Sequence, residues 1–171
     1  MLSMILATSK NGVIGNNGTL PWKKIIADMA WFREKTVSNV IIMGRKTWQS
    51  INCTPLKNRI NVVVSKQNIE NADHTISVEN NFQLLESLES LQKLYPNKEL
   101  FIIGGAQLYE STKNIVEKIY LTELEKYFEG DTVFNSAFVG HMRVIFCTSV
   151  YDQANDTNMS FTIYQRKIEE V

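Results

Sequence analysis

A chain of 171 residues is long enough for one domain with a single hydrophobic core, because folding at this length buries roughly 70% of the surface of the unfolded chain. Its 18 basic residues balance 18 acidic ones, and 44% of the chain is hydrophobic. This balance argues against a disordered polyelectrolyte and gives no electrostatic reason to expect a nucleic-acid partner.

Short apolar segments bounded by turn residues predict the strands of this chain. Several are almost continuous in Val, Ile and Leu, which is typical of strands covered on both faces. The predicted strands lie at residues 2–8, 40–43, 60–64, 75–78, 100–103 and 119–124. The first of them is too short and lacks the basic flank of a signal peptide or membrane span, so we expect a cytoplasmic protein without a membrane segment.

Helical patterns separate these strands. They cover residues 27–35, a short turn after Gly44, residues 82–94 with leucines at helical spacing, and residues 106–116. At the end, strands at 144–150 and 159–167 flank a turn-rich segment at 152–158 and predict an antiparallel hairpin. The expected fold is α/β: a single domain over residues 1–171, with one central mixed, mostly parallel sheet flanked by helices and closed by the C-terminal hairpin.

The histidines and cysteines exclude several kinds of chemistry. His74 and His141 are the only histidines, and neither lies beside a Ser or Cys nucleophile motif, which disfavours a Ser-His-Asp or Cys-His enzyme. Cys53 and Cys147 are far apart and form no C-x-x-C motif, so we expect no metal site and a reduced protein. A carboxylate or water must therefore supply any proton.

Asp28 is the single carboxylate among residues 1–33. In the first turn of the predicted helix, it shares a face with Trp31 at i+3 and Phe32 at i+4. Burial beside aromatic rings raises the pKa of an aspartate and keeps a proton available. The alternative is a helix-start aspartate stabilised by the helix dipole, and position alone does not decide between the two.

Two glycine turns follow predicted strands and precede helical segments, at Gly44 and at Gly104 and Gly105. Glycine lets a phosphate approach the backbone closely, and a helix start offers free N–H groups. Neither turn matches the Rossmann or Walker pattern, and strand-to-helix turns use glycine routinely. A dinucleotide held in another way is the hypothesis that these turns support.

Basic and hydroxyl side chains near the first turn favour a 2′-phosphate site. Arg45, Lys46 and Thr47 follow Gly44, and Ser65 and Lys66 follow the strand at 60–64, where the carboxyl end of a strand commonly meets a ligand.

Arg59 lies just before that strand. Taken alone, it is typical of a solvated surface charge.

In their order along nearly the whole chain, these segments resemble the dihydrofolate reductase family. The motifs that carry the resemblance are Leu6 and Ala7 followed by NGVIG at 11–15, LPW at 20–22 followed by Asp28 and Phe32, IMGRKTW at 42–48, Pro55 and Leu56 with Arg59, IGG at 103–105 followed by Tyr109, YLT at 120–122 and EGDT at 129–132.

The resemblance implies an NADPH-dependent oxidoreductase that reduces 7,8-dihydrofolate to 5,6,7,8-tetrahydrofolate by hydride transfer to pterin carbon 6 with protonation of nitrogen 5. Its implied catalytic residues are Asp28 on the pterin, Thr122 supporting Asp28, and Trp22 ordering a water. Arg59 is expected to grip the glutamate carboxylate of the substrate. The other implied substrate contacts are Ile5, Ala7, Phe32, Ile51, Leu56 and Ile103.

The implied cofactor contacts surround the nicotinamide and the phosphates of NADPH. They are Ala7, Ile14, Gly15, Leu20, Gly44, Arg45, Lys46, Thr47, Ser65, Lys66, Ile103, Gly104, Gly105, Ala106, Gln107, Leu108 and Tyr109. The resemblance also implies a monomer with antifolates as inhibitors, and neither a nucleic-acid nor a membrane partner.

Some positions depart from the common bacterial pattern of the family. Five residues separate Trp22 from Asp28, one more than in many bacterial members, and Gln107 stands where an arginine can assist the cofactor. Two alternatives remain: another pterin or pyrimidine reductase of the same fold, and a non-catalytic binding or structural descendant. Retention of Asp28, Trp22 and Arg59 argues against the second.

Overall fold

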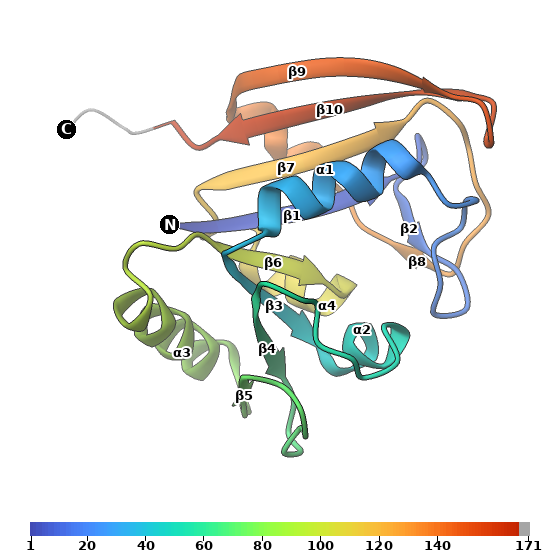
Figure 1. Ribbon diagram of the computed structural model, residues 1–171. Coiled ribbons are helices and arrows are strands. Elements are labelled where there is room, and N and C mark those ends of the chain that lie inside the picture. The colour runs from blue at the N-terminus through green and yellow to red at the C-terminus, as the bar shows by residue number, and fades with distance from the viewer. Residues whose placement is uncertain (168–171) are drawn as a thin grey trace.

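The computed structural model describes residues 1–167, in which eight strands form one mixed sheet in the order β5-β4-β3-β6-β1-β7-β10-β9 (Figure 1). The strands are β1 (Leu2–Thr8), β3 (Val40–Gly44), β4 (Ile60–Val64), β5 (His74–Ile76), β6 (Leu100–Gly104), β7 (Lys118–Leu124), β9 (Arg143–Asp152) and β10 (Thr157–Gln165). β10 pairs antiparallel with β7 and β9, whereas the other neighbours are parallel. The predicted mixed, mostly parallel sheet with a C-terminal hairpin is confirmed. Residues 168–171, which the predicted domain included, lie outside the described residues.

Helices cover both faces of this sheet. They are α1 (Ile26–Thr36), α2 (Arg45–Ser50), α3 (Asn81–Leu94), α4 (Ala106–Thr112) and the 3₁₀ helix η1 (Ala137–His141). Trp31 of α1 and Trp48 of α2 belong to one apolar cluster, and Leu88 of α3 and Leu108 of α4 belong to the other. Figure 1 shows α1 lying across the strands, on the face of the sheet that holds the first of these clusters. Among the helices within residues 1–167, none is long and apolar enough to cross a membrane.

Local sequence explains where α3 begins and what it buries. The side chain of Asn80 accepts a hydrogen bond from the backbone N–H of Gln83 at 3.0 Å, which caps the helix start. Leu84, Leu88 and Leu91 recur at helical spacing and are buried against the sheet.

Several predicted boundaries need correction. α4 ends at Thr112 and not at residue 116, although Val116 is fully buried. Val116 fits the helical spacing of apolar residues because it packs in the core, but it lies in the segment that leads into β7 and not in the helix. β5 ends at Ile76, two residues before the predicted end. The first hairpin strand, β9, is longer than predicted, whereas β10 has the predicted length but begins and ends two residues earlier.

The prediction of one sheet missed a second, two-stranded sheet. β2 (Val13–Gly15) pairs antiparallel with β8 (Thr132–Val133). Strands of three and two residues are too short to show an alternating pattern. Contacts distant in sequence hold them instead: the backbone N–H of Phe134 donates to the carbonyl oxygen of Gly12 at 2.9 Å.

Candidate active site

The two glycine turns leave the sheet side by side. β3 and β6 are parallel neighbours, and Met43 pairs with Gly104 in their register. A Cβ atom on Gly44 would lie 3.7 Å from the backbone nitrogen of Gly105, and one on Gly104 would lie 3.2 Å from Thr47 Oγ1. Glycine therefore keeps the space between the turns open.

A pocket of about 770 Å³ opens at these turns. Its volume is within the range of roughly 300–1,000 Å³ that is typical of sites for small molecules and cofactors. The predicted cofactor residues that line it are Gly44, Arg45, Lys46, Thr47, Gly105, Ala106, Gln107 and Leu108. The structure thus brings two segments about 60 residues apart in the sequence into one cradle.

Several lining residues of this pocket escaped the prediction. They are Gly18, Ser50, Val64, Val78, Glu79, Asn80, Asn81, Leu84, Ser111, Asp131 and Thr132. Two sequence signals pointed toward them: Asn80 is a typical helix cap before an apolar helical pattern, and Asp131 and Thr132 belong to the EGDT motif at 129–132.

Ser65 is linked to Arg45 through Gln67. Arg45 Nη1 donates to Gln67 Oε1 at 3.0 Å, and the backbone N–H of Gln67 donates to Ser65 Oγ at 3.1 Å. Ser65 is buried, whereas Arg45 and Lys66 are exposed. Ser65 and Lys66 are not among the residues that line the pocket, so Arg45 and Lys46 are its basic lining residues.

Asp28 lies in the first turn of α1, as predicted, and reaches the sheet. Thr122 Oγ1 of β7 donates a hydrogen bond to Asp28 Oδ1 at 2.8 Å. Thr122 is 1% exposed and pairs with Ala7 in the register of β1 and β7. Burial raises the pKa of Asp28, and the hydrogen bond from Thr122 opposes part of that rise. A carboxyl group with a raised pKa therefore lies next to the end of β1.

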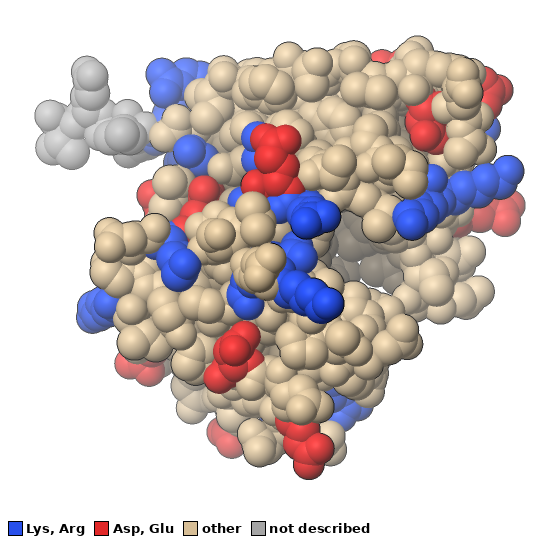
Figure 2. Space-filling model, viewed as in Figure 1, with Lys and Arg blue, Asp and Glu red and all other residues tan. Residues whose placement is uncertain are grey.

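An apolar cluster lies on the side of the sheet that α1 covers. The apolar residues among the predicted substrate contacts all belong to the apolar cluster on the α1 side of the sheet; they are Ile5, Ala7, Phe32, Ile51, Leu56 and Ile103. All except Ile5 are only partly buried, so each keeps accessible surface. Figure 2 shows the molecule hollowed between α1 and α2, with Lys and Arg side chains along one rim of the hollow.

The side chain of Arg59, which precedes β4, reaches the C-terminal end of α1. Its Nη1 donates to Thr36 Oγ1 at 3.1 Å, its Nε donates to the carbonyl oxygen of Lys57 at 3.1 Å, and its guanidinium carbon lies 5.9 Å from the centre of the Phe32 ring. Partial burial and the nearby positive charge of Arg33 lower the pKa of Arg59. No acidic partner bonds this guanidinium within residues 1–167, so it is placed to receive an anion beside Phe32.

Tyr109 connects the glycine turn to the first strand. Its hydroxyl donates to the carbonyl oxygen of Ile5 at 2.9 Å, and a Cβ on Gly104 would lie 3.4 Å from the same hydroxyl. Burial, and after it the charge of Asp28, raises the pKa of Tyr109. Tyr109 thus connects the glycine turn at Gly104 to β1, and β1 pairs with the strand that carries Thr122, the partner of Asp28.

The loop between β2 and α1 contributes Gly18 to the pocket and is held at both ends. Trp22 is buried edge-on against Phe128, with ring centres 5.6 Å apart, whereas Leu20 is 58% exposed. The side-chain amide of Asn155 both accepts from the N–H of Lys23 at 2.8 Å and donates to its carbonyl oxygen at 3.0 Å. The five-residue segment before Asp28 is therefore anchored to the turn of the C-terminal hairpin.

The other end of this loop is bound to the 129–132 segment. Asp131 Oδ2 accepts a hydrogen bond from the N–H of Asn17 at 2.9 Å, which lowers the pKa of Asp131. Ile14 packs against the α3 and α4 side of the core, and Gly15 pairs with Thr132.

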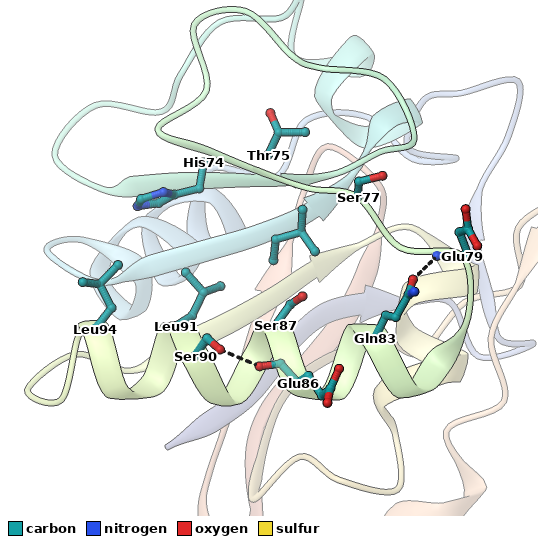
Figure 3. Close-up of a pocket in the computed structure, with 11 residues that line it drawn as sticks. His74, Thr75, Ser77, Glu79, Gln83, Glu86, Ser87, Ser90, Leu91 and Leu94 are labelled. Carbon is teal, nitrogen blue, oxygen red and sulfur yellow. Dashed lines mark hydrogen bonds between the residues drawn. The ribbon is translucent and has the colours of Figure 1, made fainter.

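A separate groove of about 590 Å³ lies between β5 and α3 (Figure 3). Its polar groups bond one another: the N–H of Glu79 donates to Gln83 Oε1 at 2.7 Å, and Ser90 Oγ donates to the carbonyl oxygen of Glu86 at 2.8 Å. His74 Nε2 lies 2.7 Å from the Tyr95 hydroxyl. The groove holds none of the predicted site residues.

Known proteins resemble this chain over nearly its whole length. A family model described as dihydrofolate reductase matches residues 1–166. The chain is similar to dihydrofolate reductase of Buchnera aphidicola subsp. Baizongia pistaciae, with 35% identity over 166 residues, covering 96% of this chain and 95% of the relative. It is 33% identical to dihydrofolate reductase of Bacillus subtilis over 172 residues, covering 98% and 95%. A solved structure of dihydrofolate reductase from Enterococcus faecalis, complexed with NADP(H) and RAB-propyl, superposes with a TM-score of 0.81 at 27% identity, covering 98% of this chain and 97% of that chain.

Proposed function

The chain belongs to the dihydrofolate reductase family, and from that premise we propose that it reduces 7,8-dihydrofolate to 5,6,7,8-tetrahydrofolate with NADPH. The hydrogen-bonded pair of Asp28 and Thr122 carries the proposal, because it places a carboxyl group of raised pKa beside the apolar cluster on the α1 side of the sheet. Tyr109 links this region to the glycine-lined pocket. Such a site can bind a pterin ring beside Asp28 and a dinucleotide in the neighbouring pocket.

Reduction of the pterin requires a hydride at carbon 6 and a proton at nitrogen 5. NADPH supplies the hydride when it is bound. We assign to Asp28 the orientation of the pterin through hydrogen bonds to its amidine edge, with Thr122 fixing the carboxyl group. Water, ordered by Trp22, delivers the proton to nitrogen 5, while Asp28 sets the polarity of the ring.

The glycine-lined pocket fits the cofactor. Its two turns lack the Cβ atoms that would narrow the space between them, and Arg45 and Lys46 offer cations to phosphate. Ala7, Ile14 and Leu20 would flank the nicotinamide, with Tyr109 beyond them. We further propose that antifolates inhibit the enzyme and that it acts in the cytoplasm.

The experiment that tests the activity is oxidation of NADPH on mixing with dihydrofolate, followed by absorbance. We expect oxidation only when both substrates are present. A pyrimidine substrate of the riboflavin pathway should give none. If NADPH is oxidised with the pyrimidine but not with dihydrofolate, the other reductase of this fold is favoured. If NADPH is oxidised with neither of them, a non-catalytic protein is favoured.

Arg45 should contribute to a preference for NADPH over NADH. A charge-assisted hydrogen bond to the 2′-phosphate is worth roughly 1.5–3 kcal/mol, so Arg45→Ala should reduce the ratio of kcat/KM for the two cofactors by at least about tenfold. Lys93→Ala, on the exposed end of α3, is the matched control. Equal kcat/KM values for NADPH and NADH in the unaltered protein would contradict the assignment.

Arg59 should recognise the acidic tail of the substrate. Loss of one charge-assisted pair in Arg59→Ala should weaken folate binding by about ten- to a hundredfold. A pteridine without the glutamate should bind nearly as before, and Lys57→Ala serves as the exposed neighbouring control. If titration calorimetry shows the same loss for both ligands, Arg59 supports the fold and does not read a carboxylate.

A further inference from the structure

The cofactor pocket extends from the glycine turns toward one side of the sheet. The parallel strands β5, β4, β3 and β6 are neighbours in that order, so their carboxyl ends follow one another along one edge. The glycine turns follow β3 and β6, whereas Ala7 lies near the carboxyl end of β1, on the other side of β6. The pyrophosphate of NADPH links its two nucleosides. A cofactor with its phosphates at the turns and its nicotinamide at Ala7 therefore extends its adenosine toward β4 and β5.

That end of the pocket has an apolar wall. Val64 at the end of β4, Val78 after β5 and Leu84 of α3 line it. Leu84 is a buried member of the core, and Val64 and Val78 pack against that core. Apolar walls with a few polar groups are typical of small-molecule sites, so this wall suits the faces of the adenine ring. The ribose then lies between the wall and the phosphates.

Arg45 and Glu79 are the charged lining residues nearest this wall in the chain and in the sheet edge. Arg45 Nη1 bonds the neutral side chain of Gln67 at 3.0 Å. Glu79 directly follows Val78, and Figure 3 shows it beside the start of α3, where its backbone N–H donates to Gln83 Oε1. Among residues 1–167 its exposed carboxylate forms no hydrogen bond and no ion pair. One free cation and one free anion thus border the adenosine end.

The other two charged lining residues, Lys46 and Asp131, are associated with each other. Asp131 accepts hydrogen bonds from the N–H of Asn17 and from the hydroxyl of Thr132, and these bonds lower its pKa. The nearby positive charge of Lys46 adds to that effect. These two charges therefore oppose one another beside the loop after β2 and leave Arg45 and Glu79 to act on the ribose.

We propose that Glu79 is a specificity-determining residue that disfavours the 2′-phosphate of NADPH and accepts a hydrogen bond from the 2′-hydroxyl of NADH. The inference rests on the proposed function. In other dinucleotide sites an acidic side chain binds the ribose 2′-hydroxyl, whereas an arginine accommodates the 2′-phosphate. This pocket has one residue of each kind. The preference for NADPH is therefore smaller than Arg45 alone would give.

The size of the effect follows from the exposure of Glu79. A phosphate monoester carries about 1.5 to 2 negative charges at neutral pH, so a carboxylate on the same pocket repels it. Water and salt weaken that repulsion, and we expect a loss of about three- to tenfold in NADPH affinity at low salt. NADH lacks the phosphate and escapes this loss. Arg45 contacts the phosphate directly, so NADPH remains the preferred cofactor.

Titration calorimetry of the whole chain with NADPH and with NADH, each without folate, tests the role of Glu79. Glu79→Gln keeps the size of the side chain and an oxygen that accepts a hydrogen bond, but it removes the charge. It should tighten NADPH binding by about three- to tenfold at low salt and leave NADH binding nearly unchanged. Glu79→Ala also removes the acceptor, so it should in addition weaken NADH binding by at least about threefold.

Glu86→Gln is the matched control. Glu86 is an exposed glutamate of α3 that lines the neighbouring groove and not the cofactor pocket, so both dissociation constants should stay unchanged. Salt provides a second control, because the Debye length falls from about 10 Å at 0.1 M to about 3 Å at 1 M. The gain of Glu79→Gln for NADPH should shrink over that range. Thermal unfolding checks that the variants remain folded.

Three results would overturn the role of Glu79. They are an unchanged ratio of the two dissociation constants in Glu79→Gln, an equal shift of that ratio in Glu86→Gln, and a gain that does not respond to salt. The first would show that Glu79 does not act on the 2′ position, the second that net charge alone is responsible, and the third that the origin is steric. If neither cofactor binds the unaltered protein, the proposed function fails together with this inference.

Discussion

Asp28→Asn should lower kcat by about a hundred- to ten-thousandfold near neutral pH while leaving NADPH binding intact. Asparagine keeps the size of the side chain, and its carbonyl oxygen can still accept the hydrogen bond of Thr122. What the substitution removes is the titrating group that orients and polarises the pterin. Stopped-flow absorbance with saturating NADPH measures the loss. Glu34→Gln, on the exposed side of the same helix, is the matched control and should have no effect.

The pH dependence separates lost chemistry from lost structure. A more acidic medium supplies protons to nitrogen 5, so the activity of Asp28→Asn should recover partly as the pH falls. A variant inactive because it is misfolded would show no recovery. Wild-type turnover with an unchanged pH profile would refute the role of Asp28 and favour another reductase or a non-catalytic protein.

Stability provides an independent test of the buried carboxylate. Burial raises the pKa of Asp28 in the folded state above its unfolded value, so the folded state binds more protons in the interval between the two. The free energy of unfolding contributed by this group is therefore present below the unfolded pKa and is lost as the pH rises through the folded pKa. Relative to wild type, Asp28→Asn should gain stability over that rise, as urea unfolding would show. The prediction is contradicted if Asp28→Asn, compared with wild type, loses stability as the pH rises.

The sequence predicted the main sheet well because its strands are strongly apolar and its helices are well separated. The continuous buried residues of β3 fit a strand covered on both faces, and the leucines of α3 fit a helix with one buried face. The motifs also predicted that the two glycine turns lie side by side, since parallel strands must bring their carboxyl ends to one edge. The hydrogen bond between Thr122 and Asp28 agrees with the supporting role that the family resemblance implied for Thr122.

What escaped prediction depends on contacts between distant segments. β2 and β8 are stabilised by each other, and neither has enough residues for a pattern of its own. The anchoring of Lys23 by Asn155 joins residues 132 positions apart, and no local signal marks an asparagine in a turn for that task. Ser65 was expected at the pocket because it follows a strand, but its burial and its bond with Gln67 are tertiary properties.

Gly130→Ala should lower kcat by about a hundredfold although Gly130 touches neither of the proposed ligands. A Cβ atom at this position would lie 2.2 Å from Val13 Cγ1 and 2.5 Å from the carbonyl oxygen of Gly15, which is far inside normal contact. Its φ is outside the left-handed region, so the steric contact is the only obstacle to alanine.

Relief of that contact must push the 129–132 segment away from β2. The shift stretches the hydrogen bond from Asn17 to Asp131 and the pairing of Gly15 with Thr132. These contacts hold β2, which contains Ile14, and the loop after it, which carries Trp22. A misplacement of about 1 Å in a positioning element costs roughly a hundredfold in rate. Single-turnover kinetics should show slower hydride transfer, with Asp28 and its pH response intact. Gly140→Ala, where a Cβ would meet nothing within 4 Å, should retain full activity. If both variants turn over at the wild-type rate, the contact between the two loops does not position the cofactor side of the site.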